Sequence, residues 1–196
     1  MIGEHRIITY GLTDKENSSI LKNIPASDYK VMNTECAADI IAFSASAVLI
    51  NAAKLSNNDY NMIIDYYTEI NGCTYETVIW IGTPVPQGAL KKQFKCYESF
   101  DIIENNLKYI LLSAHSKSQK AASFSKKLAD GIKILSLIRN RPGITTRELA
   151  ETMELSQRTI QRYIASLQAA NEWIEYNRAK KGWELQDGKS VLFGDI

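Results

Sequence analysis

Residues 1–116 alternate short apolar runs with amphipathic segments, and this alternation predicts five strands that each precede a helix. The predicted strands are residues 6–10, 29–32, 47–50, 77–81 and 94–97. The predicted helices are residues 16–24, 36–43, 58–70, 87–90 and 101–116. The third strand is apolar throughout, as expected of a central strand buried on both faces. Pro25 and Asn71-Gly72 are stop signals for the first and third helices.

Alternation of strands and helices at this spacing favours a parallel sheet, because parallel strands need a crossover connection between them. We therefore expect an α/β domain with a doubly wound, flavodoxin-like sheet of five parallel strands, covered by helices on both faces. In such folds, ligands and reactive groups lie at the carboxyl ends of the strands.

The last third of the chain begins with a predicted helix at residues 125–139, which Ser125 caps and Arg141-Pro142-Gly143 ends. Its expected apolar face consists of Leu128, Ile132, Leu135 and Ile138. Ile144 follows as a short predicted strand.

Two short helices with a tight turn come next. Thr145 and Glu148 have the spacing of a capping box, which predicts a helix from residue 146 to 153. The turn falls at Glu154 and Leu155, and Ser156 is a good N-cap for a second helix. In the second helix the apolar positions are Ile160, Ile164 and Leu167. The polar and basic positions on its other side are Gln157, Arg158, Gln161 and Arg162.

Residues 173–176 and 182–185 read as two strands of a β-hairpin. Its tip holds three cations, Arg178, Lys180 and Lys181. Three helices followed by a basic hairpin predict a winged helix-turn-helix domain, in which Trp173 and Trp183 are expected to pack the wing onto the helices.

Between the two patterns, residues 117–125 are small and polar with two lysines, which predicts a linker. We place the domain boundary there, giving residues 1–118 and 119–196. A helix that continues from Asp101 through this segment is the alternative. The charge also changes near residue 120, because residues 1–120 carry 11 basic and 13 acidic side chains and residues 121–196 carry 12 and 9. A nucleic-acid partner would thus be bound through locally placed contacts.

The sequence gives little support for other chemistry. Cys36, Cys73 and Cys96 are odd in number and widely spaced, which favours reduced thiols over disulfides or a zinc site. We expect no metal and no cofactor, since neither a glycine-rich dinucleotide motif nor a P-loop occurs. No membrane span or signal peptide is indicated, so we expect a cytoplasmic protein. We do not expect an enzyme, because the sequence offers no assembled set of nucleophile, base or metal ligands.

Residues 5–116 resemble the receiver domain of bacterial response regulators. The segments AVLIN at 47–51 and YESFD at 97–101 carry the resemblance, since they match the strand that ends at the phosphoacceptor and the junction before the last helix. The chemical residues of the family are absent. Tyr10-Gly11 replaces its acidic pair, Asn51 its phosphoacceptor aspartate and Glu98 its lysine, and only the hydroxyl after the fourth strand remains, as Thr83. We expect a pseudo-receiver that phosphate does not switch, because an amide is a poor nucleophile and no flanking carboxylates hold Mg²⁺.

Residues 125–187 resemble the winged helix-turn-helix domains of the DeoR type and the related HTH eleven class. The phrase ITTRELAETMELSQRTIQRYIASLQ, followed by IEYNRAKKGWEL, carries this resemblance. It implies that the following residues contact DNA: Arg147, Ser156, Gln157, Arg158, Gln161, Arg162, Arg178, Lys180 and Lys181. The residues of the second helix would face the major groove, and the hairpin cations would touch phosphate or minor-groove edges.

The expected function is that of a transcriptional regulator that binds double-stranded DNA as a homodimer. By analogy with receiver domains, the dimer surface would draw on residues 87–116. Two alternatives stay open. One is a regulator that senses a small-molecule effector at the strand ends near Tyr10, Asn51 and Thr83, and the other is a winged-helix module that binds a partner protein.

Overall fold

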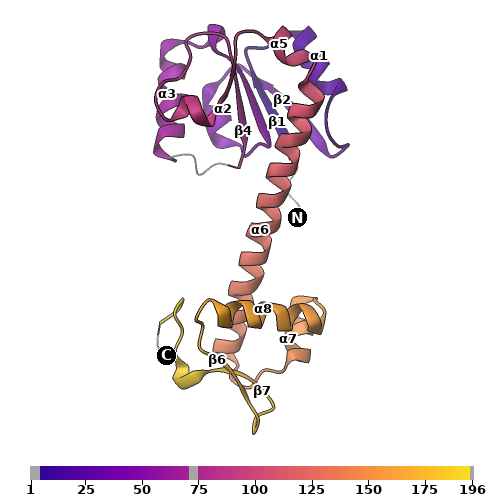
Figure 1. The fold of residues 1–196 in the computed structure, drawn as a ribbon, viewed down its shortest axis with the longest axis vertical. Helices are drawn as coiled ribbons and strands as arrows, with labels where there is room; N and C mark the ends of the chain where they lie inside the picture. Colours follow the sequence, from indigo (N-terminus) through magenta and orange to yellow (C-terminus); the bar gives the residue numbers. More distant parts are fainter. Residues whose placement is uncertain (1–4, 71–74, 195–196) are drawn as a thin grey trace. The chain divides into compact units, whose positions relative to one another are not determined.

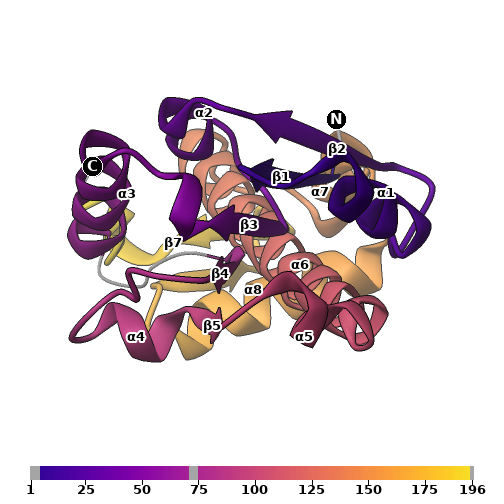
Figure 2. The same cartoon turned by 90° about the horizontal axis from the view of Figure 1, so that it is seen from above.

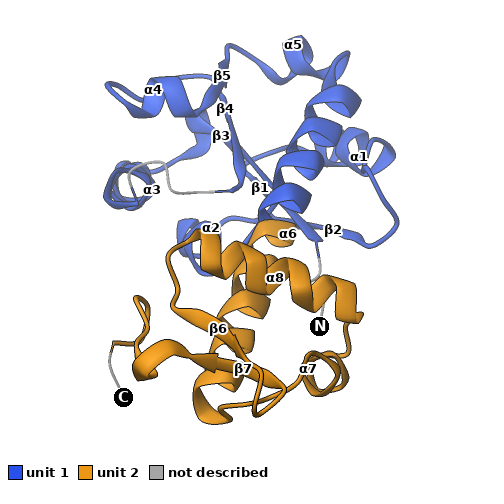
Figure 3. Cartoon of the chain, turned by 60° about the horizontal axis from the view of Figure 1, so that its bottom comes forward, with its two compact units in different colours: residues 1–121 blue, residues 122–196 orange. Residues whose placement is uncertain are grey.

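The computed structural model describes residues 5–70 and 75–194 and divides the chain into two compact units, residues 1–121 and 122–196 (Figure 3). The expected boundary after residue 118 lies inside a helix, α6 (Leu107–Asn140), that belongs to both units. The expected helix stop at Asn71-Gly72 and the thiol of Cys73 lie outside the described residues.

The first unit is an α/β domain with five parallel strands (Figure 1). The strands are β1 (His5–Tyr10), β2 (Tyr29–Thr34), β3 (Ala47–Asn51), β4 (Thr77–Ile81) and β5 (Lys95–Tyr97). The helices are α1 (Asp14–Lys22), α2 (Ala37–Ala42), α3 (Asn57–Glu69), α4 (Leu90–Gln93), α5 (Phe100–Glu104) and the start of α6, with a single 3-10 turn, η1 (Ala52–Lys54), after β3. The strand order β2-β1-β3-β4-β5 is the flavodoxin-like order, which confirms the predicted fold.

Helices cover both faces of this sheet, with α1, α5 and α6 on one side and α2, α3 and α4 on the other (Figure 2). On the first side, Leu49 and Ile79 of the sheet pack with Leu107 of α6. On the second side, Ile50 and Trp80 pack with helix residues such as Ile63 and Tyr67. Successive strand residues point to opposite faces, so β3 and β4 are apolar at nearly every position.

Two predicted helices of this unit have different bounds. The helix expected at 87–90 forms at Leu90–Gln93, because Gly88 has a left-handed backbone (φ 64°) that a helical turn does not accommodate. The helix expected at 101–116 is interrupted, since α5 ends at Glu104 and α6 begins at Leu107.

The predicted linker at residues 117–125 is wrong, because α6 continues through it to Asn140. Ser125 is therefore an exposed residue inside the helix and caps nothing. The segment contains neither Gly nor Pro, and its Lys, Gln and Ala residues are good helix formers. The continuous helix that the sequence left open is the one that forms.

The second unit contains the end of α6, then α7 (Thr146–Met153), α8 (Gln157–Ala169), a hairpin of β6 (Ile174–Asn177) and β7 (Gly182–Leu185), and a 3-10 turn, η2 (Gln186–Gly188). In its core, Ile134, Leu135 and Ile138 of α6 pack against helices and hairpin. The expected apolar face of α6 was partly wrong, since Leu128 and Ile132 are 55% and 38% exposed. Among the described residues, no helix has both the length and the apolar character that a bilayer crossing demands.

Candidate nucleic-acid interface

The capping box predicted at Thr145 starts α7. The Thr145 hydroxyl accepts a hydrogen bond from the Glu148 backbone amide (3.2 Å), and the Thr145 amide donates to the Glu148 carboxylate (2.8 Å). Hydrogen bonds from the side chain and backbone of Thr145 lower the pKa of Glu148. This arrangement fixes where the helix-turn-helix begins.

The turn between the two helices also follows the prediction. Glu154 ends α7 in a left-handed conformation (φ 54°, ψ 39°), and the amide of Leu155 donates back to the Ala150 carbonyl (3.0 Å). The Ser156 hydroxyl then caps α8 by accepting from the Thr159 amide (3.1 Å). Ser156 itself is exposed, so its hydroxyl stands at the start of the outward surface.

The rotation of α8 about its axis is fixed by packing. Ile160 and Ile164 are 0% and 1% exposed, and the Tyr163 hydroxyl donates to the Asp130 carboxylate on α6 (3.1 Å). The pKa of Tyr163 is raised, mainly by burial of the side chain and further by the hydrogen bond to Asp130. These contacts leave the opposite side of α8 in solvent, with Gln157, Arg158, Gln161 and Arg162 exposed. We call this set, with Ser156, the outward face of α8.

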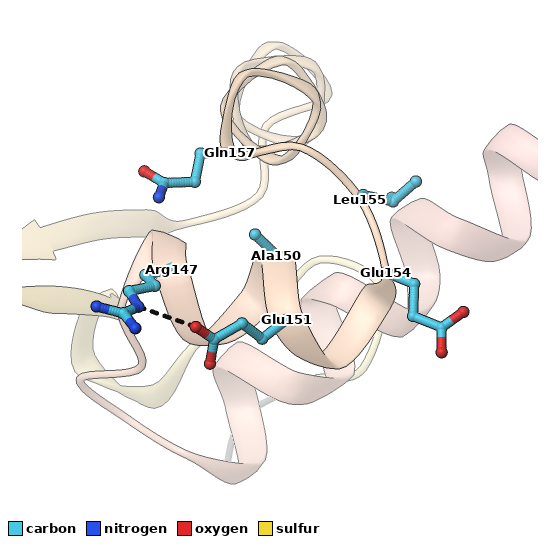
Figure 4. Close-up of a pocket in the computed structure, with 6 residues that line it drawn as sticks. All are labelled: Arg147, Ala150, Glu151, Glu154, Leu155 and Gln157. Atoms are coloured by element: carbon cyan, nitrogen blue, oxygen red, sulfur yellow. Dashed lines mark hydrogen bonds and ion pairs between the residues drawn. The ribbon is translucent and has the colours of Figure 1, made fainter.

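An open groove of about 370 Å³ separates α7 from the start of α8 (Figure 4). Ala150 and Leu155 contribute apolar atoms to its wall, and Arg147 and Gln157 project on the same side of it. Arg147 is exposed, and its Nε atom lies 2.9 Å from the Glu151 carboxylate, which raises the pKa of the guanidinium. Among the residues predicted to contact DNA, Arg147 is the one in α7. The Glu151 carboxylate neutralises part of its positive charge.

The tip of the hairpin is shaped by Asn177, whose side-chain carbonyl accepts from the amides of Ala179 (2.9 Å) and Lys180 (3.0 Å). Arg178, Lys180 and Lys181 are all exposed there, as predicted. The Lys180 ammonium lies 2.7 Å from the Glu184 carboxylate, an ion pair that the sequence analysis did not anticipate. Its signal is the separation of Lys180 and Glu184 by four positions in sequence.

The base of the wing is held by β7. The backbone of Trp183 exchanges hydrogen bonds with the Gly143 amide (2.8 Å) and the Ile144 carbonyl (2.8 Å), and its indole donates to the Thr146 hydroxyl (2.9 Å). Trp183 therefore packs the wing onto the helices as expected. Trp173 does not, since it is 46% exposed and lies under the Lys189 ammonium. The reason is its place one residue before β6, outside the paired strands.

Asn51, the position that the resemblance to receiver domains assigns to the phosphoacceptor, is held by internal hydrogen bonds. The Asn51 amide group donates to the Gly11 carbonyl (3.1 Å), and its oxygen accepts from the Ala53 amide (3.2 Å). Gly11 has φ 67°, and a Cβ atom there would lie 2.6 Å from the Cβ of Lys54. Lys54 thus covers the end of β1, a neighbour that sequence analysis missed although it follows Asn51 by three residues.

The other three residues predicted for this site, Tyr10, Thr83 and Glu98, lie along the same carboxyl edge of the sheet. Tyr10 is buried, and its hydroxyl donates to the Asp59 carboxylate (3.2 Å). The pKa of Tyr10 is raised, mainly by burial of the side chain and further by the negative charge of Asp59. Thr83 and Glu98 follow β4 and β5 and are exposed. The structure thus brings Tyr10, Gly11 and Asn51 together at the ends of neighbouring strands.

Comparison with curated proteins gave no match. Among solved structures, the chain is similar to one titled as a low-resolution structure of the response regulator StyR, with 12% identity and a TM-score of 0.42 over 85% of this chain and 92% of that one. Residues 132–184 match the family described as an HTH domain. This range contains α7, α8 and nearly the whole hairpin. The last third of the chain therefore carries a helix-turn-helix domain, which supports a DNA-binding regulator.

Proposed function

We propose that this protein is a transcriptional regulator that inserts α8 into the major groove of double-stranded DNA. One observation carries the proposal. The two buried isoleucines and the Tyr163 contact orient α8 so that its Arg and Gln side chains all face solvent, within the segment that matches an HTH domain. A helix that presents such groups fits the major groove, where base edges carry donors and acceptors.

The side chains of this face have distinct roles in the proposal. Arg158 and Arg162 pair with guanine, and Gln161 pairs with adenine, at roughly 1–3 kcal/mol of discrimination for each good pair. Ser156 and Gln157 stand at the start of α8, where a helix N-terminus suits phosphate or a neighbouring base. Arg147 contacts the backbone from α7.

The wing supplies contacts that do not depend on sequence. Arg178 and Lys181 are exposed at the hairpin tip and bind phosphate or the minor-groove edge. Lys180 is paired with Glu184 in the free protein. It binds phosphate either when this ion pair opens or through the part of its positive charge that Glu184 does not neutralise.

In the proposal the first unit works without aspartyl phosphorylation. Phosphotransfer needs a carboxylate nucleophile and further carboxylates for Mg²⁺, and the nucleophile position holds Asn51. Glu16, which follows Tyr10-Gly11 by a few residues in sequence, is engaged in the capping box of Thr13. The Asn51 side chain is engaged in hydrogen bonds, and Lys54 packs over Gly11 at the same edge of the sheet. Both observations argue against a ligand pocket there.

The first unit instead supplies a dimer surface in this proposal. Three apolar side chains of α5 and the first turns of α6 are exposed to solvent: Ile102 of α5 at 50%, and Tyr109 and Leu112 of α6 at 76% and 43%. We call them the α5–α6 patch. A homodimer would cover this patch and present two copies of α8 to paired half-sites.

Selection of bound sequences from a pool of random duplexes tests the function. The full chain should enrich one motif and bind it with an affinity that falls steeply as salt rises, because phosphate contacts release counterions. The variant Lys180→Ala with Lys181→Ala should weaken binding to every duplex and flatten the salt dependence. A protein that enriches no motif and shows no salt-dependent binding to any duplex would instead be a module for a partner protein.

A further inference from the structure

The chain continues past the matched HTH segment into a turn that folds back onto the second unit. Residues 186–194, here called the C-terminal clasp, lie beyond residue 184, where the match ends. Phe193 packs against the core of the unit. Its carbonyl accepts from the Arg139 guanidinium (3.3 Å), which lies 5.4 Å from the centre of the Phe193 ring. The clasp is therefore docked by packing as well as by hydrogen bonds.

A buried carboxylate joins this clasp to the wing. Glu172 is 8% exposed, and its two oxygens accept hydrogen bonds from the Ser190 hydroxyl (2.9 Å) and the amides of Val191 (3.2 Å) and Leu192 (2.8 Å). A buried carboxylate without such donors is costly, so Glu172 and the clasp depend on one another. Ser190 also accepts from the Phe193 amide (3.1 Å), which closes the turn.

Glu172 stands where α8 passes into the wing. Its backbone amide donates to the Leu167 carbonyl at the end of α8 (3.0 Å), and its carbonyl accepts from the Ile174 amide at the start of β6 (2.9 Å). The amide of Gln186 donates to the Trp173 carbonyl (2.7 Å), which adds a second link between clasp and wing. Since β7 is already held through Trp183, the clasp secures the other strand of the hairpin.

We propose that Glu172 is a positioning residue for DNA binding, which holds β6 so that the wing tip meets the phosphate backbone while α8 lies in the groove. This inference rests on the proposed function. It assigns a role to a buried acid that touches no DNA itself, and to a segment outside the matched HTH domain.

The test measures how the affinity of the full chain for its selected duplex depends on salt. Glu172→Ala should weaken binding several-fold and lower the slope of log Kd against log salt by about 1 to 2, since each lost phosphate contact removes about 0.9. The change removes a negative charge, which by itself would tighten binding to DNA. Glu175→Ala, which removes an exposed carboxylate from β6 itself, is the charge-matched control and should bind DNA as well as the wild type or better.

A thermodynamic cycle separates positioning from general destabilisation. Adding Glu172→Ala to a triple variant, Arg178→Ala with Lys180→Ala and Lys181→Ala, should cause little further loss, because the wing-tip cations that Glu172 positions are already gone. Full additivity, or weaker binding with an unchanged salt slope, would overturn the proposal. Ser190→Ala, which removes one of the three donors, gives a milder version of the same test if Glu172→Ala fails to fold.

Hydrogen exchange gives a readout that does not involve DNA. In the Glu172→Ala and Ser190→Ala variants, the amides of Ile174 and Gln186 should exchange faster while those of α8 stay protected. If no variant and no wild-type protein binds any duplex, the proposed function fails. Hydrogen exchange still tests whether the clasp holds β6 in that case. Unchanged protection of the Ile174 amide in the variants would show that it does not.

Discussion

At the residue scale, Asn51 lies at the position that the resemblance to receiver domains assigns to the phosphoacceptor. Its amide nitrogen and oxygen both hold neighbouring backbone, so the side chain is a structural cap at the end of β3. An amide does not attack a phosphoryl group, and Tyr10-Gly11 supplies no carboxylate for Mg²⁺.

We therefore expect no aspartyl phosphate when the protein is incubated with acetyl phosphate and Mg²⁺. The measurement is intact mass before and after mild acid, with an active receiver protein as the positive control. An acid-labile gain of one phosphoryl group would contradict this account.

Glu148 makes the start of α7 sensitive to pH. Its pKa is lowered in the folded chain, so the capping box contributes fully above about pH 4.5 and is lost as the pH falls through the lowered pKa. We expect Glu148→Ala to lower the melting temperature at pH 7 and to have a smaller effect at pH 3. Thermal unfolding at both pH values measures this, and an equal difference at both would show that the ionised carboxylate is not what caps the helix.

At the scale of elements, the signals with a local physical cause were predicted well. Thr145, Glu148 and Ser156 form the expected caps, since capping depends on residues three apart in sequence. The spacing of Ile160 and Ile164 correctly placed the buried side of α8, and with it the exposed positions of the candidate interface. Whether those positions contact DNA stays a prediction.

The errors come from packing at a distance. Polar residues 117–125 resemble a linker, yet the helix passes through them because Leu107, Leu111 and Ala114 before them and Ile134 and Ile138 after them are buried. Leu128 and Ile132 were expected in the core from their spacing, but no other element covers them enough to bury them. The roles of Lys54 and Glu172 depend on segments that the fold alone brings together.

Two glycines should respond in opposite ways to alanine. A Cβ on Gly182 would lie 1.9 Å from the Gly143 carbonyl oxygen, so Gly182→Ala should displace β7 and cost about 3 kcal/mol or more. A Cβ on Gly131, inside α6, would lie 3.9 Å from the Tyr163 ring, so Gly131→Ala should stabilise the fold by about 1 kcal/mol. Urea unfolding followed by circular dichroism measures both, and changes of the same sign would contradict the packing described at one of the two sites.

At the scale of the whole molecule, the account requires two copies of the chain. Tyr109→Glu should convert the dimer into a monomer and weaken binding to a duplex with two half-sites, because a charge in an apolar interface is costly. Phe124→Glu changes an apolar residue of α6 that is 63% exposed but lies outside the α5–α6 patch, and serves as the matched control. Light scattering after size exclusion gives the mass of each variant. A wild-type monomer at all concentrations would contradict dimerisation, and a dimeric Tyr109→Glu would exclude this surface.

The central claim is that the outward face of α8 reads bases, and Arg162 tests it most directly. The measurement is the ratio of affinities for the selected duplex and for a random duplex of equal length, in the wild type and in Arg162→Ala. The account predicts that the ratio falls by about 5- to 150-fold, as the loss of one good base pairing at roughly 1–3 kcal/mol implies, while binding to random DNA changes little. An equal loss on both duplexes, or no loss on either, would contradict a role for this face in reading sequence.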